Sequence, residues 1–312
     1  EDVWHQLDVR KEESGMTALP TGKSKNKVKM SKADLTFTVV TYIICALIFI
    51  VIVYPLYFVV IASFSNPDAI QRGEMWFFPV EPSFSAYEEV FHRTEVWIGY
   101  RNTIIYTVGN TFFALLFTLP AAYVCGRKVF PLRTPLMIFF LIAMYFNGGL
   151  VPTYLQVMRL GMLDTIWAMI LPTSVSVYNL IIARTFFAST IPDELREAAN
   201  LDGCSDFRFF ATIVLPLSKA IIAVVGLYTA VAQWNSYMNA LIYIQSDALK
   251  PLQLVLRAIL INNQKDAGGS VEVVRKAEML KYALIVVSTV PIMCVYPFIQ
   301  KYFEKGVMIG AV

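Results

Sequence analysis

Glu197 is the side chain of this sequence best placed to bind a partner through its charge. It stands in a short polar segment, residues 191–203, between two strongly apolar stretches. Pro192 and the acidic residues after it favour a helix start, because proline suits the first helical position and carboxylates suit the positive end of the helix dipole. Gly203 can take the positive φ that ends a helix in a sharp turn. The segment predicts a short helix whose carboxylate docks in a partner's groove by charge-assisted hydrogen bonds.

Helical spacing places the apolar residues of this segment near one face and the charged ones on the others. The apolar set is Leu195, Ala198, Ala199 and Leu201, and the charged set is Glu194, Arg196 and Glu197. An ordinary amphipathic connector between two membrane helices would show the same pattern. On these seven or so residues alone, both interpretations stay open.

Two further groups of polar side chains could line a path for a polar solute. Tyr145 and Asn147 flank Gly148-Gly149, which would unwind or kink a helix, and Gln233, Trp234 and Asn235 end a long apolar run. Rings stack on sugar C–H faces, and amides both donate to and accept from hydroxyls. The alternatives are a helix end followed by a re-entrant turn at Gly148, and the usual preference of Trp and Tyr for the membrane interface.

Several kinds of chemistry are disfavoured by what the sequence lacks. It has two histidines, His5 and His92, and four cysteines without paired spacing, so neither a metal site nor a disulfide framework is expected. Thr21-Gly22-Lys23-Ser24 imitates the end of a phosphate-binding loop. That loop needs glycine at position 17, which is Thr17. The sequence therefore predicts neither an enzyme nor an ATPase, and it needs no cofactor of its own.

Composition places these residues in an all-α membrane protein. The chain is 57% hydrophobic and 16% charged, against about 25% charged residues in soluble domains. Uncharged runs longer than about 18 residues indicate membrane spans. Lipid offers no hydrogen-bond partners to the backbone, so we expect these spans to be helices, which satisfy their own backbone groups. We expect six transmembrane helices within the runs 34–68, 101–127, 133–159, 164–184, 219–247 and 281–301.

Most of the 26 Lys and Arg residues fall on one set of the segments between these runs, the set that includes both termini. The positive-inside rule therefore predicts that both termini, and with them Glu197, are cytoplasmic. Residues 1–34 are expected to form a cytoplasmic basic tail attracted to membrane lipid, and 35–312 a six-span domain. The net charge of +3 reflects this topology and does not indicate nucleic acid.

The polar segment and the residues after it resemble a known signature. Glu197-Ala198-Ala199, Gly203 and then Ile213, Leu215 and Pro216 fill every fixed position of the cytoplasmic "EAA" motif of permease subunits in binding-protein-dependent ABC importers. The ending from Gln300 to Val312 also resembles this family, and Trp234-Asn235 resembles its maltose-type carbohydrate permeases.

The resemblance implies the ABC importer permease fold, with a cytoplasmic coupling helix. Glu197, Ala198, Ala199, Asp202 and Gly203 would couple the chain to the ATPase. The implied partners are a second homologous permease, two ATPase subunits that bind ATP and Mg²⁺, and an extracellular solute-binding protein. The implied location is a bacterial or archaeal plasma membrane, and the implied cargo is a sugar or oligosaccharide.

Two other functions fit the sequence less well. An ion-driven secondary transporter usually carries an intramembrane carboxylate or charged pair, and the six runs contain none. An intramembrane enzyme would need clustered His, Ser or carboxylate side chains, which are not evident. An ABC permease for another solute remains open.

Overall fold

The computed structural model describes residues 31–146, 148–266, 280–295 and 297, and this part of the chain contains helices and no strand. The chain divides into two compact units, residues 1–54 and 55–312. The helix Lys32–Ala62 (α2) crosses that division. The predicted boundary after residue 34 concerns a tail that lies mostly outside the described residues, so it stays a prediction.

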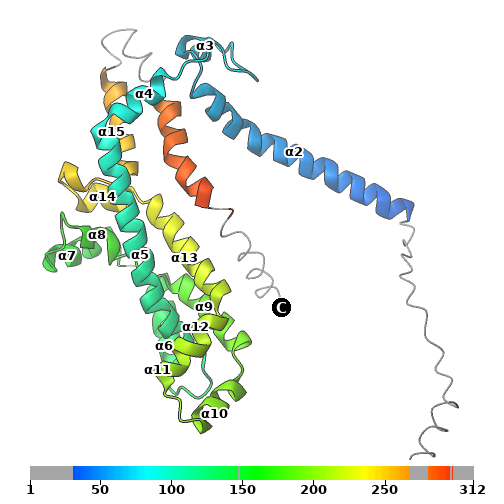
Figure 1. Cartoon of the computed structure of the whole chain (residues 1–312), viewed down its shortest axis with the longest axis vertical. Helices are drawn as coiled ribbons and strands as arrows, with labels where there is room; N and C mark the ends of the chain where they lie inside the picture. Colours follow the sequence, from blue (N-terminus) through cyan, green and yellow to red (C-terminus); the bar gives the residue numbers. More distant parts are fainter. Residues whose placement is uncertain (1–30, 147, 267–279, 296, 298–312) are drawn as a thin grey trace, which may run out of the picture. The chain divides into compact units, whose positions relative to one another are not determined.

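Helices of very different lengths follow one another along the described chain (Figure 1). After α2 they are α3 (Pro67–Gln71), α4 (Ser85–His92), α5 (Thr94–Gly126), α6 (Arg133–Tyr145), α7 (Leu150–Arg159), α8 (Ile166–Ile170), α9 (Val177–Thr190), α10 (Asp193–Leu201), α11 (Asp206–Phe209), a π-helical turn η1 (Phe210–Val214), α12 (Leu215–Leu217), α13 (Lys219–Trp234), α14 (Met238–Tyr243), a 3₁₀ turn η2 (Asp247–Leu249) and α15 (Leu252–Asp266). A final apolar helix covers Leu280–Val295.

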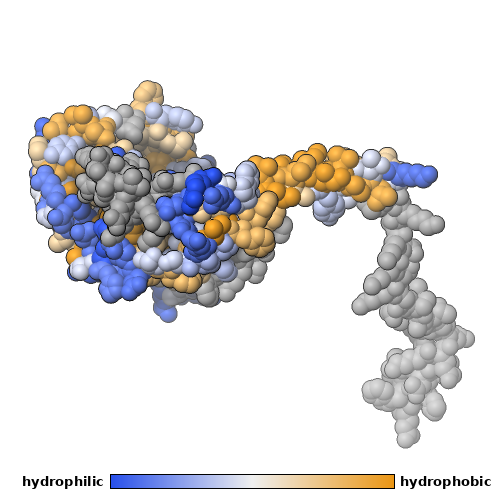
Figure 2. All heavy atoms as spheres, turned by 90° about the horizontal axis from the view of Figure 1, so that it is seen from above, coloured by the Kyte–Doolittle hydropathy of each residue, from blue (hydrophilic) through white to orange (hydrophobic). Residues whose placement is uncertain are grey.

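The first predicted span is one uninterrupted helix. α2 is 31 residues long, and apolar side chains cover it (Figure 2). Pro55 lies inside it, which membrane helices tolerate when neighbouring groups satisfy the freed carbonyl. The length and composition of α2 are sufficient to cross a membrane.

In the second unit, α5 is the central element. It is 33 residues long and packs against α9, α13 and α15. One of its ends lies beside α4 and α15, and the other lies beside α10 and α11 (Figure 1). The largest buried cluster gathers around its second half and joins α5, α9, α13 and the α10–α11 segment, including Tyr123, Phe187 and Phe209.

The end of α5 nearest α15 holds the chain between α14 and α15 through side-chain hydrogen bonds. Asn102 Nδ2 donates to the carbonyls of Ala248 (2.8 Å) and Lys250 (3.0 Å). Thr103 Oγ1 accepts from the backbone N–H of Leu252 (2.8 Å), the first residue of α15. These bonds hold the start of α15 directly after Pro251.

The carboxylate of Asp164, in the loop before α8, also holds a distant backbone segment through hydrogen bonds. Asp164 Oδ1 accepts from the backbone N–H groups of Gln245 and Ser246, both at 2.9 Å, and Oδ2 bonds the Ser246 hydroxyl. These bonds, the hydroxyl first, lower the pKa of Asp164 below its usual value. Asp164 therefore stays ionised and ties the α7–α8 loop to the chain that follows α14.

The spans are less continuous than the uncharged runs suggest. α2 and α5 are each long and apolar enough to cross a membrane, and there are up to four such spans if two bent helix pairs count as one span each. One pair joins α6 to α7 across the Gly148-Gly149 break, where Gly149 has φ +86°. The other joins residues 206–217 to α13 with a bend of 82°.

The fourth run differs most from expectation. Residues 164–184 form α8 and the first half of α9 rather than one helix, with a non-helical stretch over 171–176. Pro172 lies in this stretch, and proline cannot donate the hydrogen bond that would continue a helix. Ser176 then caps α9 by accepting from the backbone N–H of Asn179 (3.4 Å).

Gly99 gives a test of the packing between α5 and α15. A Cβ at Gly99 would lie 2.9 Å from Leu252 Cα, whereas a Cβ at Gly226 of α13 would meet only ordinary contacts, the nearest at 3.8 Å. We expect Gly99→Ala to lower stability by about 1–3 kcal/mol through overpacking. The matched Gly226→Ala should be neutral, or stabilising by up to about 1 kcal/mol. Thermal unfolding of the detergent-solubilised protein measures both, and equal melting temperatures for the two variants would contradict this packing.

Candidate functional site

The predicted polar helix exists as α10, and local chemistry sets both of its ends. Pro192 is the residue just before the first turn, one position earlier than expected, and Asp193 and Glu194 are in the first turn. At the other end Gly203 has φ +70°, and its N–H bonds the carbonyl of Asn200 at 3.0 Å. The predicted positive φ at Gly203 is confirmed.

The inward face of α10 differs from the predicted apolar face. Of the four apolar residues that we expect near one face of the helix, only Ala199 is buried. Leu195 and Leu201 are exposed, Leu201 to 90%. Arg196 turns inward instead and is only 14% exposed. It pairs with Asp206 and lies 5.6 Å from the centre of the Phe209 ring. The ion pair between Arg196 and Asp206 therefore orients α10, and the leucines of this helix are left at the surface.

The carboxylates of the motif are on the outer side of this helix. Glu197 is exposed, as are Ala198, Asp202 and Gly203. Among the described residues, no side chain forms an ion pair with Glu197 or Asp202. Together with Leu195 and Leu201 they make a mixed surface of apolar and acidic side chains, which we call the α10 surface.

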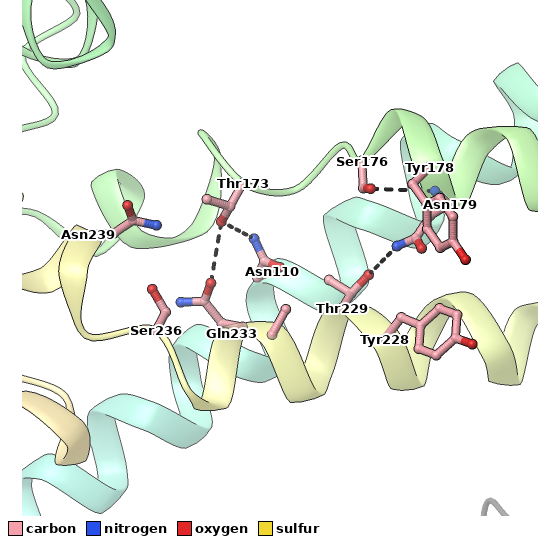
Figure 3. A pocket seen from close by; sticks show the side chains of 11 residues that line it. Asn110, Thr173, Ser176, Tyr178, Asn179, Tyr228, Thr229, Gln233, Ser236 and Asn239 are labelled. Carbon is pink, nitrogen blue, oxygen red and sulfur yellow. Dashed lines mark hydrogen bonds between the residues drawn. The ribbon is translucent and has the colours of Figure 1, made fainter. Parts of the chain in front are cut away.

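A second candidate site is a polar cavity of about 420 Å³ (Figure 3). It lies where α5, the 171–176 break, α9 and the end of α13 come together. Its lining is rich in amides and hydroxyls: Asn110, Thr173, Ser176, Tyr178, Asn179, Tyr228, Thr229, Ala232, Gln233, Ser236 and Asn239.

Hydrogen bonds from side chains in the cavity satisfy backbone that is left without a helical partner at the break between α8 and α9. Asn110 Nδ2, from α5, donates to the free carbonyl of Ile170 (2.6 Å) and to Thr173 Oγ1 (3.0 Å). Thr173 Oγ1 in turn donates to Gln233 Oε1 (3.3 Å). Figure 3 shows the two hydrogen bonds of Thr173, with Asn110 and with Gln233. Non-helical backbone at membrane depth is tolerated where protein or a polar cavity satisfies it, and Asn110 provides that satisfaction.

Gln233 leaves a hydrogen-bond donor free in this cavity. The residue is 5% exposed, and its Nε2 has no partner among the described residues. In Figure 3 that nitrogen points to the side of the cavity where Ser236 and Asn239 lie. On the opposite side, Asn179 Nδ2 makes a long 3.4 Å bond to Thr229 Oγ1. The cavity can therefore donate to and accept from a hydroxylated solute.

The structure brings one of the five predicted pathway residues, Gln233, into the cavity. Trp234 is buried, and its Nε1 donates to the Ser288 carbonyl at 3.2 Å. Asn235 is exposed and bonds the Val231 carbonyl of its own helix. Tyr145 is 75% exposed at the end of α6. Asn147 lies outside the described residues.

Sequence reasoning did not identify the other polar residues of the cavity. Asn110, Asn179 and Thr229 come from helices with overall apolar sequences. One feature of the sequence could have identified them. Burying an amide in an apolar helix is unfavourable unless it has a partner, so an amide at such a position indicates a structural or functional role. Within the described residues there is no cluster of His, Cys, Asp or Glu that could hold a metal ion.

Comparisons with known proteins agree with this architecture. The family model "Binding-protein-dependent transport system inner membrane component" matches residues 96–309. The polygalacturonan/rhamnogalacturonan transport system permease protein YtcP of Bacillus subtilis (strain 168) is 38% identical over 267 residues, which are 84% of this chain and 93% of that protein. Protein LplC of the same organism is 37% identical over 285 residues, 90% of this chain and 96% of that protein.

A solved structure supports the fold directly. A chain from the crystal structure of a bacterial ABC transporter involved in the import of the acidic polysaccharide alginate superposes with a TM-score of 0.80 at 30% identity. The match covers 88% of this chain and 99% of that one.

These matches define a transport role for the chain. The chain is an integral, multi-pass permease subunit of an ABC importer; it is not an enzyme, and the partner ATPase binds the ATP. With a family model that covers more than two thirds of its length and a relative at 38% identity, the chain belongs to the family of binding-protein-dependent transport system inner membrane components.

Proposed function

We propose that this permease translocates an oligosaccharide, with fragments of acidic polysaccharides as the first candidates. The observation that supports the sugar class most strongly is the 38% identity to a polygalacturonan/rhamnogalacturonan permease, together with the fold shared with an alginate importer. The amides and hydroxyls of the cavity suit a hydroxylated solute. A permease for another solute is the alternative, and the uptake experiments below distinguish the two.

The working complex of this proposal contains four kinds of subunit. This chain pairs with a second, homologous permease, two ATPase subunits bind ATP, and an extracellular binding protein delivers the solute. The length and apolar composition of α2 support contact with lipid. ATP binding moves the ATPases, and the permease alternates between its inward- and outward-facing states.

The proposed topology has six spans with both termini in the cytoplasm. α2 and α5 are two of them, and the bent pairs α6–α7 and α11–α13 would supply two more. The α8–α9 pair and the helix Leu280–Val295 would complete the set. Residues 1–34 form the cytoplasmic tail, and 35–312 form the permease domain.

Coupling to the ATPase is assigned to the α10 surface. Glu197 and Asp202 offer free carboxylates, Ala198 allows close approach, and Gly203 provides the tight exit of the chain. Leu195 and Leu201 add apolar area that no described residue covers. Ala199 is buried and fixes the inner side of the helix.

The solute path is assigned first to the cavity around Gln233. Its free amide donor and the long bonds of Thr173 and Asn179 are available for exchange with solute hydroxyls. Tyr145, Asn147, Trp234 and Asn235 stay predictions for other parts of the path.

Topology is tested by thiol labelling in a background without native cysteines. A cysteine at Ser85 of α4 should react with a membrane-impermeant maleimide added to sealed cells. A cysteine at Ser205, just after Gly203, should react only after the cells are opened. Labelling of position 205 from outside would overturn the proposed orientation.

The coupling role predicts a difference between two charge reversals on the same helix. Glu197→Lys should lower uptake at least about tenfold, because loss of a charge-assisted bond costs on the order of 1.5–3 kcal/mol. Glu194→Lys, also exposed and one turn nearer the start of α10, is the matched control and should affect uptake much less. Binding-protein-stimulated ATP hydrolysis and uptake of oligogalacturonides are measured on the same purified complex. Normal coupling in Glu197→Lys would remove this role.

The cavity predicts a loss of transport without a loss of stability. Gln233→Leu removes a donor that has no described partner and, with Oε1, only the long bond from Thr173, so the melting temperature should change little. Uptake of oligogalacturonides should still fall by about threefold or more, because the solute loses a hydrogen bond worth roughly 0.5–1.5 kcal/mol. Thr185→Val, an exposed hydroxyl of α9 bonded to the Ile181 carbonyl, is the control. Uptake at the wild-type rate in Gln233→Leu would exclude the cavity from the path.

A further inference from the structure

Asp206 lies between two arginines from different elements. Its Oδ1 is 3.4 Å from Arg127 Nη1, at the end of α5, and it also pairs with Arg196 Nη2 of α10. We propose that Asp206 is a positioning residue that ties the α10–α11 segment to α5, so that motion of α10 is passed to α5. This inference rests on the proposed coupling role of α10.

Both arginines are held in place by more than the ion pairs. The Arg127 guanidinium lies 5.7 Å from the centre of the Tyr123 ring, and that of Arg196 lies 5.6 Å from the Phe209 ring. Their side chains are only 24% and 14% exposed, whereas that of Asp206 is 70% exposed. Asp206 is the one carboxylate that pairs with either arginine among the described residues.

The covalent route from α10 into the membrane is poorly suited to carry the same motion. After α11 the chain passes through the π-helical turn η1, and Pro216 follows within α12. At Ser218 the chain then bends by 82° before α13 begins. A π turn, a proline and a bend each interrupt the regular ladder of helix hydrogen bonds, so α10 and α13 are not one rigid body.

The side-chain route to α5 is direct. Asp206 joins α10 and α11 to Arg127, the residue that follows the last turn of α5. The Phe210 and Tyr123 rings, 5.2 Å apart, pack beside this bridge and connect the same two segments. α5 in turn carries Asn110, which lines the cavity. Displacement of α10 would thus reach the cavity through α5, which stays helical across Pro120 without a bent break of the kind before α13.

The bridge contributes little to stability, which separates its role from folding. Asp206 is 70% exposed, so solvent weakens its ion pairs, and the buried cluster around Tyr123, Phe187 and Phe209 holds these elements together without them. Removal of the Asp206 charge leaves two guanidiniums near each other, and their repulsion loosens the contact between α10 and α5. We therefore expect the coupling to change more than the fold.

The test follows ATP hydrolysis and motion at the cavity in the same complex. The assembled importer is reconstituted with the cavity variant Ser236→Cys in a background without native cysteines, and maleimide labelling is timed with and without Mg-ATP. In Asp206→Asn we expect hydrolysis within about twofold of wild type, because the exposed pair adds little stability. The ATP-dependent change in labelling rate should shrink about tenfold, the effect of an energy near 1.4 kcal/mol. Asp206→Glu should restore it.

Arg208→Gln, which removes an exposed charge from the same short helix, is the matched control and should behave as wild type. If Asp206→Asn fails to copurify with the ATPase, Arg127→Gln carries the test from the α5 side. An unchanged labelling response in Asp206→Asn, or loss of assembly in both variants, overturns this inference. If labelling of the wild-type complex does not respond to ATP at all, the proposed coupling function fails instead.

Discussion

Backbone groups that leave a helix inside an apolar environment must find another hydrogen-bond partner, and this constraint organises the structure around α5. Each unsatisfied group in lipid costs several kcal/mol. α5 supplies the partners from its own side chains at two levels. Asn102 and Tyr106 bond carbonyls of the turn before α15, and Asn110 bonds the carbonyl of Ile170 at the break after α8. The irregular segments of the second unit are thus anchored to one long helix.

The two ends of α5 are held by different forces. At the α15 end, neutral amide and hydroxyl bonds and the close approach at Gly99 leave no room for adjustment. At the α10 end, an exposed carboxylate and two guanidiniums over aromatic rings add to the buried cluster around Tyr123, Phe187 and Phe209. Electrostatic contacts tolerate small displacements better than close packing does, because their energy falls slowly with distance. Ion pairs of this kind at the α10 end of α5 suit the proposed transmission of motion from the ATPase.

The sequence predicted what local chemistry decides. Pro192 and Gly203 mark the ends of α10 within one residue, and α2 follows from the first apolar run. Residues far apart in sequence decide the rest. The inward turn of Arg196 depends on Asp206 across a turn, and the break after α8 depends on Asn110, 60 residues from Ile170. Propensity and periodicity carry no information about such partners, so the inward position of Arg196 was not predicted and the cavity was found only at Gln233.

The amides of the cavity serve the fold, and in the proposed function they also serve the passage of a solute. The bond from Asn110 to the Ile170 carbonyl is short, at 2.6 Å, and satisfies backbone. The bonds between Thr173 and Gln233 and between Asn179 and Thr229 are long, at 3.3 and 3.4 Å, and join side chains only. Long bonds are weak and can be exchanged for solute hydroxyls without disturbing the backbone. A transport path needs sites that bind strongly enough to admit the solute and weakly enough to release it, and side-chain pairs of this kind meet both conditions.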